Sequence, residues 1–144
     1  MISYFKSKNI TAKPVNNQYL WIKDVDTLFN LLIECWSKET CAPRMQDEWS
    51  ENNKTLGQCS ITSFLVQDIF GGKVYGIKLE DGSIHCFNKI HDEFFDLTSS
   101  QFGERNLNYL NAEMQNREKH FSKEEKYNRY LKLKVSLENK NPNL

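Results

Sequence analysis

The chain lacks an excess of charge, a long apolar run and a recognisable targeting segment. Its 19 Lys and Arg residues balance 19 Asp and Glu residues, so no overall electrostatic field attracts nucleic acid or an anionic membrane. Its apolar runs are only a few residues long, whereas about 20 are needed to span a bilayer. The N-terminus "MISYFKSKNI" has no apolar centre like that of a signal peptide. These absences predict a cytoplasmic protein that binds neither nucleic acid nor membranes.

The sequence also lacks the patterns that hold metals and cofactors. Its four cysteines, Cys35, Cys41, Cys59 and Cys86, contain no CxxC pair. His85 and Cys86 would point to opposite sides of a strand, so they are poorly placed to share a zinc ion. Because nothing indicates secretion, the thiols are expected to stay reduced. Without a glycine-rich phosphate loop or a metal-ligand cluster, no cofactor is predicted.

Length and composition predict a single folded domain, residues 1–144. A chain of this length buries roughly two thirds of the surface that its unfolded form exposes, and the 12% aromatic share argues against disorder. Apolar residues at helical spacing predict a first helix that begins at Asp24 or Asp26. The polar stretch "CAPRMQDEWSENNKTLG", residues 41–57, predicts a long irregular loop, a kind of segment that often carries function.

A central helix and three strands are expected next. The helix runs from about Gln58 or Cys59 to Phe70, has an apolar face, and ends at a pair of glycines. The β-prone stretches "KVYGIKL", "SIHCFN" and "EFFDLT" then predict an antiparallel meander. The expected fold class is therefore α+β, with the cysteine-bearing helix packed on one face of a small antiparallel sheet.

The ends of the chain give weaker signals. "QYLWI", residues 18–22, predicts either a short strand or an apolar entry into the first helix. The chain from residue 99 onward is highly charged and is predicted to be helical, with a frayed tail from about residue 139. His91 lies in a polar turn, and both His91 and His120 are expected to be exposed.

Cys59, His85 and Asp96 together predict a thiol nucleophile. A helix N-terminus and a nearby imidazolium both lower the pKa of a cysteine, and a carboxylate can orient the imidazole. If "NKIHDE" forms the loop between the last two strands, Phe87 lies opposite Phe94 and His85 lies opposite Asp96, with Cβ atoms about 4.5 to 5.5 Å apart. Each residue alone also fits a structural role, so the prediction rests on the ordered set and on that register.

These motifs resemble known families. The order of helix-head cysteine, strand histidine and aromatic-flanked aspartate is similar to the transglutaminase-like branch of the papain-like superfamily. The stretches "TCAPR", "GQCSITSFLVQDIFGG", "DGSIHCFN" and "FDLTSSQFG" resemble the bacterial YunG-like family of uncharacterised proteins, over about residues 28–103. The resemblance implies a papain-like domain in which Cys59 is the nucleophile, His85 the general base and then acid, and Asp96 the orienting carboxylate.

The same resemblance implies a donor for the oxyanion besides the Cys59 backbone N–H. Papain-like enzymes often supply it from a side-chain amide some six residues before the cysteine, a position that Asn53 holds in this chain. Gln58, immediately before the cysteine, is a second candidate. Either amide is equally compatible with a solvated loop.

Three residues in and beside the long loop are candidates for substrate binding. Trp36, Arg44 and Trp49 are expected to line a cleft, with Arg44 meeting a substrate carboxylate. The alternative is that the tryptophans anchor the loop and Arg44 pairs with a local acid such as Asp47.

Three functions are compatible with these residues. The first is a cysteine-dependent hydrolase or acyl transferase that acts on an amide, such as a peptide or a glutamine side chain, through a thioester. The second is a catalytically silent papain-like module that binds a peptide or protein in the same cleft. The third is a thiol redox sensor, for which Cys41 is the only plausible resolving cysteine. The expected partner is a peptide, protein or small amide, and the oligomeric state is not indicated.

Overall fold

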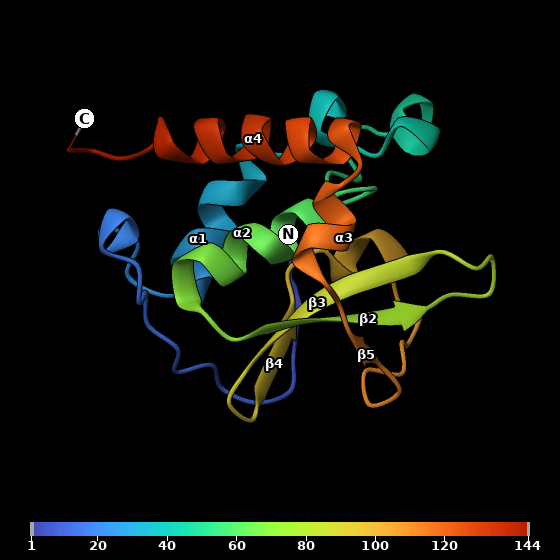
Figure 1. The fold of residues 1–144 in the computed structure, drawn as a ribbon, viewed down its shortest axis with the longest axis horizontal. Helices are drawn as coiled ribbons and strands as arrows, with labels where there is room; N and C mark the ends of the chain where they lie inside the picture. The colour runs from blue at the N-terminus through green and yellow to red at the C-terminus, as the bar shows by residue number, and fades with distance from the viewer. Residues whose placement is uncertain (1, 144) are drawn as a thin grey trace.

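Helices cover one face of a five-stranded antiparallel sheet in the computed structural model, which describes residues 2–143. In Figure 1, α4 lies across the top, the sheet lies at the bottom, and α1 and α2 lie between them. The helices are α1 (Val25–Ile33), α2 (Cys59–Phe70), α3 (Arg117–Phe121) and α4 (Glu124–Glu138). The strands are β1 (Phe5–Lys6), β2 (Lys73–Lys78), β3 (Ile84–Ile90), β4 (Glu93–Asp96) and β5 (Glu113–Met114). The predicted α+β class with a small antiparallel sheet is confirmed.

Both helices of the first half form where the apolar spacing places them. Asp24 is the N-cap of α1, and its carboxylate accepts a hydrogen bond from the backbone N–H of Thr27 at 2.8 Å. The second helix, α2, begins at Cys59 and ends where Gly71 adopts a positive φ of 79°. This left-handed conformation suits a glycine because it has no Cβ.

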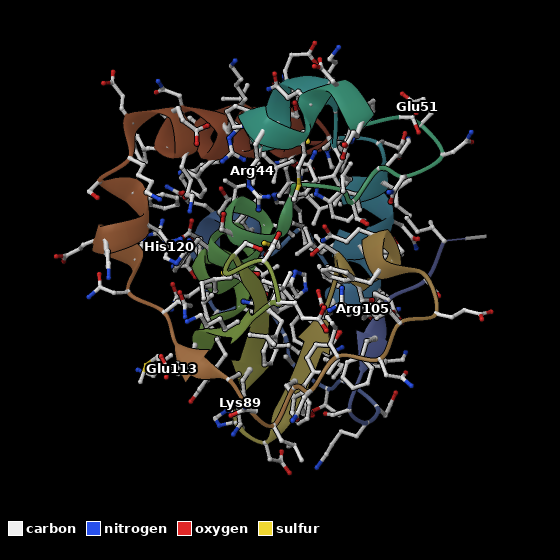
Figure 2. All side chains as sticks on the ribbon, turned by 90° about the vertical axis from the view of Figure 1, so that its right-hand side faces the viewer. Arg44, Glu51, Lys89, Arg105, Glu113 and His120 are labelled. Atoms are coloured by element: carbon white, nitrogen blue, oxygen red, sulfur yellow. The ribbon has the colours of Figure 1, made fainter. Side chains whose placement is uncertain are left out.

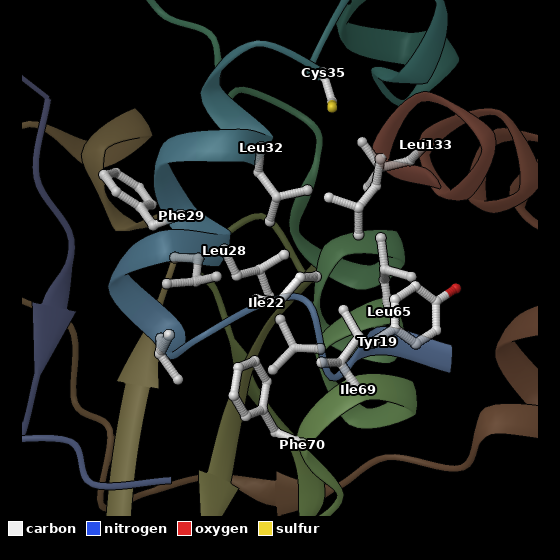
Figure 3. Packing of buried hydrophobic residues seen from close by; sticks show 14 of the residues in the cluster. Tyr19, Ile22, Leu28, Phe29, Leu32, Cys35, Leu65, Ile69, Phe70 and Leu133 are labelled. Atoms are coloured by element: carbon white, nitrogen blue, oxygen red, sulfur yellow. The ribbon is translucent and has the colours of Figure 1, made fainter. Parts of the chain in front are cut away.

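The core lies between α2 and its neighbours. Ile61, Leu65 and Ile69 on α2 are fully buried in one cluster with side chains from α1 and α4. Figure 3 shows Leu28 and Leu32 of α1 and Leu133 of α4 converging on Leu65 and Ile69. Burying a leucine side chain contributes about 1.5 to 3 kcal/mol, so this packing fixes where the N-terminus of α2 lies relative to the sheet.

The strand order is β1-β4-β3-β2-β5, and the register between β3 and β4 differs from the prediction. Asn88 pairs with Phe95 and Ile90 with Glu93, because the hairpin closes in a two-residue turn instead of the six-residue loop expected from the sequence. The predicted pairing of His85 with Asp96 is therefore wrong by two residues. A shift of two keeps every side chain on its face, so His85 and Asp96 remain on the same side of the sheet.

Other departures from the sequence predictions concern short segments. The stretch 18–22 forms no strand, since Asn17–Tyr19 is a 3₁₀ turn. The chain after residue 99 is not continuously helical: residues 103–112 form turns and irregular structure, and Glu113–Met114 forms the edge strand β5 beside β2. The two-residue strand β1, which pairs with β4, was not predicted either.

The long loop between α1 and α2 is closed by a backbone contact at its two ends. It contains a 3₁₀ segment, Pro43–Glu48, and the N–H of Ala42 donates to the carbonyl of Gly57 at 3.0 Å. Gly57 has a φ of 71°, and a Cβ at this position would come within 2.6 Å of the Cys41 sulfur. The loop therefore needs glycine here, two residues before Cys59.

Candidate active site

Cys59 is the first residue of α2 and stands at an uncapped helix N-terminus. No side chain caps this end, and the first helical hydrogen bond runs from the N–H of Thr62 to the carbonyl of Gln58 at 3.1 Å. The N–H groups of the first turn therefore have no intrahelical acceptor, and the helix dipole favours a negative charge beside them. Cys59 is partly exposed, whereas Cys35, Cys41 and Cys86 are buried.

His85 and Asp96 form a buried pair on the other side of this site. The Nε2 atom of His85 lies 2.6 Å from Oδ2 of Asp96, and both side chains are about 1% exposed. Phe102 covers the imidazole edge-on, with ring centroids 4.7 Å apart. Burial by itself lowers the pKa of His85, but the Asp96 carboxylate and then Cys59 outweigh it and raise that pKa to about 10.

The carboxylate of Asp96 is held by two further residues. Its Oδ1 accepts from the N–H of Thr98 at 3.1 Å, and its Oδ2 accepts from the hydroxyl of Tyr109 at 2.7 Å. Tyr109 itself stacks on Phe5 of β1, with ring centroids 4.2 Å apart. The side chain of Asp96 is therefore fixed against His85 by contacts from the segment that follows β4.

The sulfur of Cys59 lies against the backbone at the beginning of β3, 3.8 Å from the carbonyl oxygen of Ile84. Strand β4 pairs with β3 only from Asn88 to Ile90, so this end of β3 is left open. His85 and Cys86, on opposite faces of this strand, both affect the pKa of Cys59. Hydrogen bonding from Cys86 is the largest cause that lowers the pKa of Cys59 well below its usual value, and the hydrogen bond and charge of His85 add to it against the effect of burial.

The arrangement favours a charge-separated pair. The pKa of Cys59 is lowered and the pKa of His85 is raised. Both shifts favour a thiolate beside an imidazolium over two neutral side chains. Because Nε2 of His85 is taken by Asp96, Nδ1 is the ring nitrogen that remains for the sulfur. The site can therefore present a nucleophile and a proton donor at the same time.

Cys59 and His85 open into a cleft of about 1020 Å³. Figure 2 looks onto this side of the molecule, with His120 and Arg105 on either side of the view and Arg44 above them. All three of these residues line the cleft. Its walls come from the long loop, the hairpin between β2 and β3, the segment after β4, and the helices α3 and α4.

Of the three predicted substrate-binding residues, the structure brings only Arg44 to this cleft. Trp36 is buried in the core, where its Nε1 donates to Oγ1 of Thr62 at 2.9 Å. Trp49 donates from Nε1 to the carbonyl of Lys54 at 2.9 Å and so anchors the loop. The alternative role of anchoring the loop matches Trp49 but not Trp36, which contacts α2. Residues 2–143 contain no ion pair between Arg44 and Asp47.

Neither predicted oxyanion amide lies in the cleft. Gln58 is fully buried, and its Nε2 donates to the carbonyl of Ser37 at 3.0 Å, while its Oε1 has no partner. Asn53 lies in a small bridge with Ser50 inside the loop. The donors that remain beside Cys59 are the backbone N–H groups of the first turn of α2.

Sequence analysis missed four residues of this site: Cys86, Tyr109, His120 and Lys126. His120, which was expected to be exposed, is half-buried and lines the cleft, where its Nδ1 lies 2.9 Å from Nζ of Lys126. Burial and the neighbouring Lys126 lower the pKa of His120 to about 4. The adjacency of His85 and Cys86 was a signal for Cys86, but the other three follow only from tertiary contacts.

Residues 2–143 lack two further features, a metal-binding cluster and a membrane-spanning helix. No group of three or more His, Cys, Asp or Glu side chains is placed to hold a metal ion. No helix in the described part of the chain is long and apolar enough to cross a membrane.

Comparison with known proteins places the chain in a family. The family model described as "YunG protein" matches residues 24–141. The chain belongs to the YunG family. It is also similar to "Uncharacterized protein YunG" of Bacillus subtilis (strain 168), with 32% identity over 72 residues. That match covers 50% of this chain and 57% of the relative. No solved structure matches the chain.

Proposed function

We propose that the protein is a cysteine-dependent hydrolase or acyl transferase that acts on an amide through a thioester, with Cys59, His85 and Asp96 as its catalytic set. The observation that carries the proposal is that Cys59 and His85 line one cleft, with Nε2 of His85 2.6 Å from Oδ2 of Asp96. Packing alone does not require a thiol, an imidazole and a carboxylate to meet in this order at the wall of a cleft.

The first step is attack by the Cys59 thiolate on the amide carbonyl. The thiolate is stabilised by Cys86, by the His85 imidazolium and by the N-terminus of α2. The carbon–sulfur bond forms as the carbonyl oxygen takes up the electron pair. The free backbone N–H groups of the first turn are the donors for that oxyanion.

The second step expels the amine. The oxyanion collapses, the carbon–nitrogen bond breaks, and the proton on Nδ1 of His85 passes to the leaving nitrogen. The resulting thioester is then attacked by water in a hydrolase or by a second amine in a transferase, and the now neutral imidazole takes the proton of the incoming nucleophile. The hydrogen bond to Asp96 keeps the ring oriented in each step.

A papain-like relation is part of this proposal. The supporting features are the order of the three residues along the chain, the cysteine at the head of a helix that packs on the sheet, and the histidine and aspartate on successive antiparallel strands. The same order of residue types is typical of the transglutaminase-like branch, to which the motifs bear a resemblance.

Alkylation of the thiols tests the proposal directly. At pH 6, iodoacetamide should label Cys59 at least about a hundredfold faster than Cys35, because an ordinary thiol is almost fully protonated there. His85→Ala should remove this preference. His91→Ala is the matched control, since His91 is an exposed histidine in the β3–β4 turn, and it should leave the rate unchanged. Equally slow labelling of Cys59 and Cys35 would contradict the enzyme proposal and favour a catalytically silent binding module.

The contact between Cys59 and Cys86 supports a second candidate, a thiol redox sensor. Peroxide would convert the Cys59 thiolate into a sulfenic acid with release of hydroxide, and the Cys86 thiol would then form a disulfide with release of water. The structure places Cys86, not Cys41, beside Cys59: Cys41 is fully buried under Gly57. Hydrogen bonding to Cys59 and burial raise the pKa of Cys86 well above its usual value, which slows the second step.

Mass spectrometry after mild peroxide separates the two candidates. A redox sensor should give a reversible Cys59–Cys86 disulfide that Cys86→Ser abolishes. For the enzyme proposal, Cys86→Ser should reduce the Cys59 labelling rate without removing its dependence on His85. Accumulation of sulfenic acid without a disulfide would contradict the sensor.

A further inference from the structure

Lys126 is a basic side chain in the cleft that is hydrogen-bonded to the imidazole of His120. It lies on α4, lines the cleft and is half-buried. Its Nζ donates to Nδ1 of His120 at 2.9 Å, and Nε2 of His120 faces Oε1 of Gln115, also at 2.9 Å. Each ring nitrogen of His120 therefore has a fixed role, and the imidazole positions the ammonium without neutralising it.

No carboxylate in the described chain compensates Lys126. No ion pair within 4.0 Å involves it among residues 2–143. Its neighbour Glu125 is taken by Arg129, which contacts both carboxylate oxygens and also donates to the carbonyl of Thr40. Burial is the largest cause that lowers the pKa of Lys126, and the nearby Cys86 and Cys59 oppose it only in part, as expected for a partly desolvated ammonium without a carboxylate partner.

The cleft as a whole has an excess of positive charge, although the chain is neutral overall. Its acidic lining residues are Glu80, Asp81 and Glu125. Its basic lining residues are Arg44, Arg105, Lys119, Lys123, Lys126 and Arg129. Of these six, only Arg129 forms an ion pair within residues 2–143. A cleft with an excess of one sign of charge concentrates ligands of the opposite sign.

We propose that Lys126 binds a carboxylate of the substrate, so that the cleft selects amides that carry an acidic group, such as glutamyl or aspartyl peptides. The proposal rests on the function proposed for Cys59 and adds the substrate class. Two of the three ammonium protons of Lys126 have no protein acceptor among the described residues and can both be donated to a carboxylate.

Two alkylating agents, one anionic and one neutral, test this inference. Iodoacetate carries a carboxylate and iodoacetamide does not, whereas both react with the same thiolate. The measured quantity is the ratio of their rate constants at Cys59, divided by the same ratio for N-acetylcysteine amide. This quotient cancels any change in the pKa of Cys59. It should exceed one and fall about tenfold in Lys126→Met, because a hydrogen bond to a charged group is lost.

Two further variants, Lys126→Arg and Lys132→Met, are the controls for this quotient. Lys126→Arg should largely keep the preference for iodoacetate. Lys132→Met, at an exposed position of the same helix outside the cleft, should leave it unchanged. A quotient that does not respond to Lys126→Met while Cys59 still reacts rapidly with both reagents would overturn the inference alone. Slow reaction of Cys59 with both reagents in the unmodified protein would instead overturn the proposed function.

Protection of the unmodified protein gives a readout that does not depend on how any variant folds. Glutarate, a dicarboxylate, should slow iodoacetamide labelling of Cys59 at concentrations at which glutaramide, its neutral diamide, does not. The protection should weaken as salt is raised from 0.05 to 0.5 M, since added ions screen the attraction. Equal protection by both compounds would also overturn the inference.

Discussion

Two histidines on opposite sides of the cleft have opposite electrostatic environments. His85 on β3 faces the Asp96 carboxylate, and its pKa is raised to about 10. His120 on α3 faces the Lys126 ammonium, and its pKa is lowered to about 4. Burial favours the neutral form of both rings. Asp96 reverses that direction at His85, whereas Lys126 adds to the effect of burial at His120. At neutral pH His85 therefore has a ring proton to give as an imidazolium, and His120 is neutral.

The largest expected effect comes from removing the carboxylate. Asp96→Asn should lower the pKa of His85 from about 10 toward or below its ordinary value of 6.5, because burial then meets less opposition. Histidine ring NMR measures this directly, and iodoacetamide labelling of Cys59 at pH 7 should slow about tenfold. Asp92→Asn, at an exposed aspartate in the adjacent turn, should change neither quantity. A His85 ring still protonated at pH 8 in Asp96→Asn would show that Asp96 does not set its charge.

A second prediction concerns stability and pH in Cys59→Ser, where only one partner of the pair titrates. In the folded variant Asp96 still raises the pKa of His85, although the contribution of Cys59 is lost, whereas the unfolded chain releases the proton near 6.5. The unfolded state therefore binds fewer protons in this window, and the free energy of unfolding should fall as pH rises, by at most about 1.4 kcal/mol per pH unit.

Chemical denaturation of Cys59→Ser between pH 6 and 9 measures this slope. Adding Asp96→Asn should flatten it. In the unmodified protein the slope should be smaller, because Cys59 has a lowered pKa and contributes a stabilising term that grows with pH. A steeper slope in the unmodified protein than in Cys59→Ser would contradict the thiolate–imidazolium pair.

A smaller effect is expected from the hydroxyl that helps to hold Asp96. Tyr109→Phe removes the donor 2.7 Å from Oδ2, the same oxygen that faces His85. The free energy of unfolding should fall by about 1.5 kcal/mol, as for other hydrogen bonds to charged groups, while Cys59 labelling changes only a few-fold. Tyr127→Phe, at an exposed tyrosine, is the control and should have no measurable effect on either quantity.

The smallest effect concerns the other histidine. Lys126→Met should raise the pKa of His120 above about 4, but burial remains its largest cause and should keep it below 6.5. Ring NMR of His120 follows this change, with Lys132→Met as the control. An unchanged pKa of His120 would show that Lys126 does not contribute to it. The difference between the pKa values of the two histidines would then not reflect the charge of the group beside His120.

Local patterns predicted much of the fold. Both helices of the first half and the three-strand meander follow from apolar spacing, caps and turn residues, because these elements bury a periodic set of side chains. Strands β1 and β5 were not predicted, because each has two residues and forms only where a longer strand supplies hydrogen-bond partners. The register of β3 and β4 was wrong by two residues, because a tight turn at His91 and Asp92 replaced the expected loop.

Helix and strand periodicity alone predicts that Cys59 heads an apolar helix and that His85 and Asp96 share one face of the sheet. Strand alternation depends only on parity, so this last prediction survived an incorrect register. The surroundings of these residues depend on tertiary packing: Tyr109 contacts Asp96, Cys86 acts on Cys59, and Lys126 contacts His120 in the cleft. These contacts join segments far apart in the chain. No local propensity encodes them, because they are fixed by how the helices and the sheet pack together.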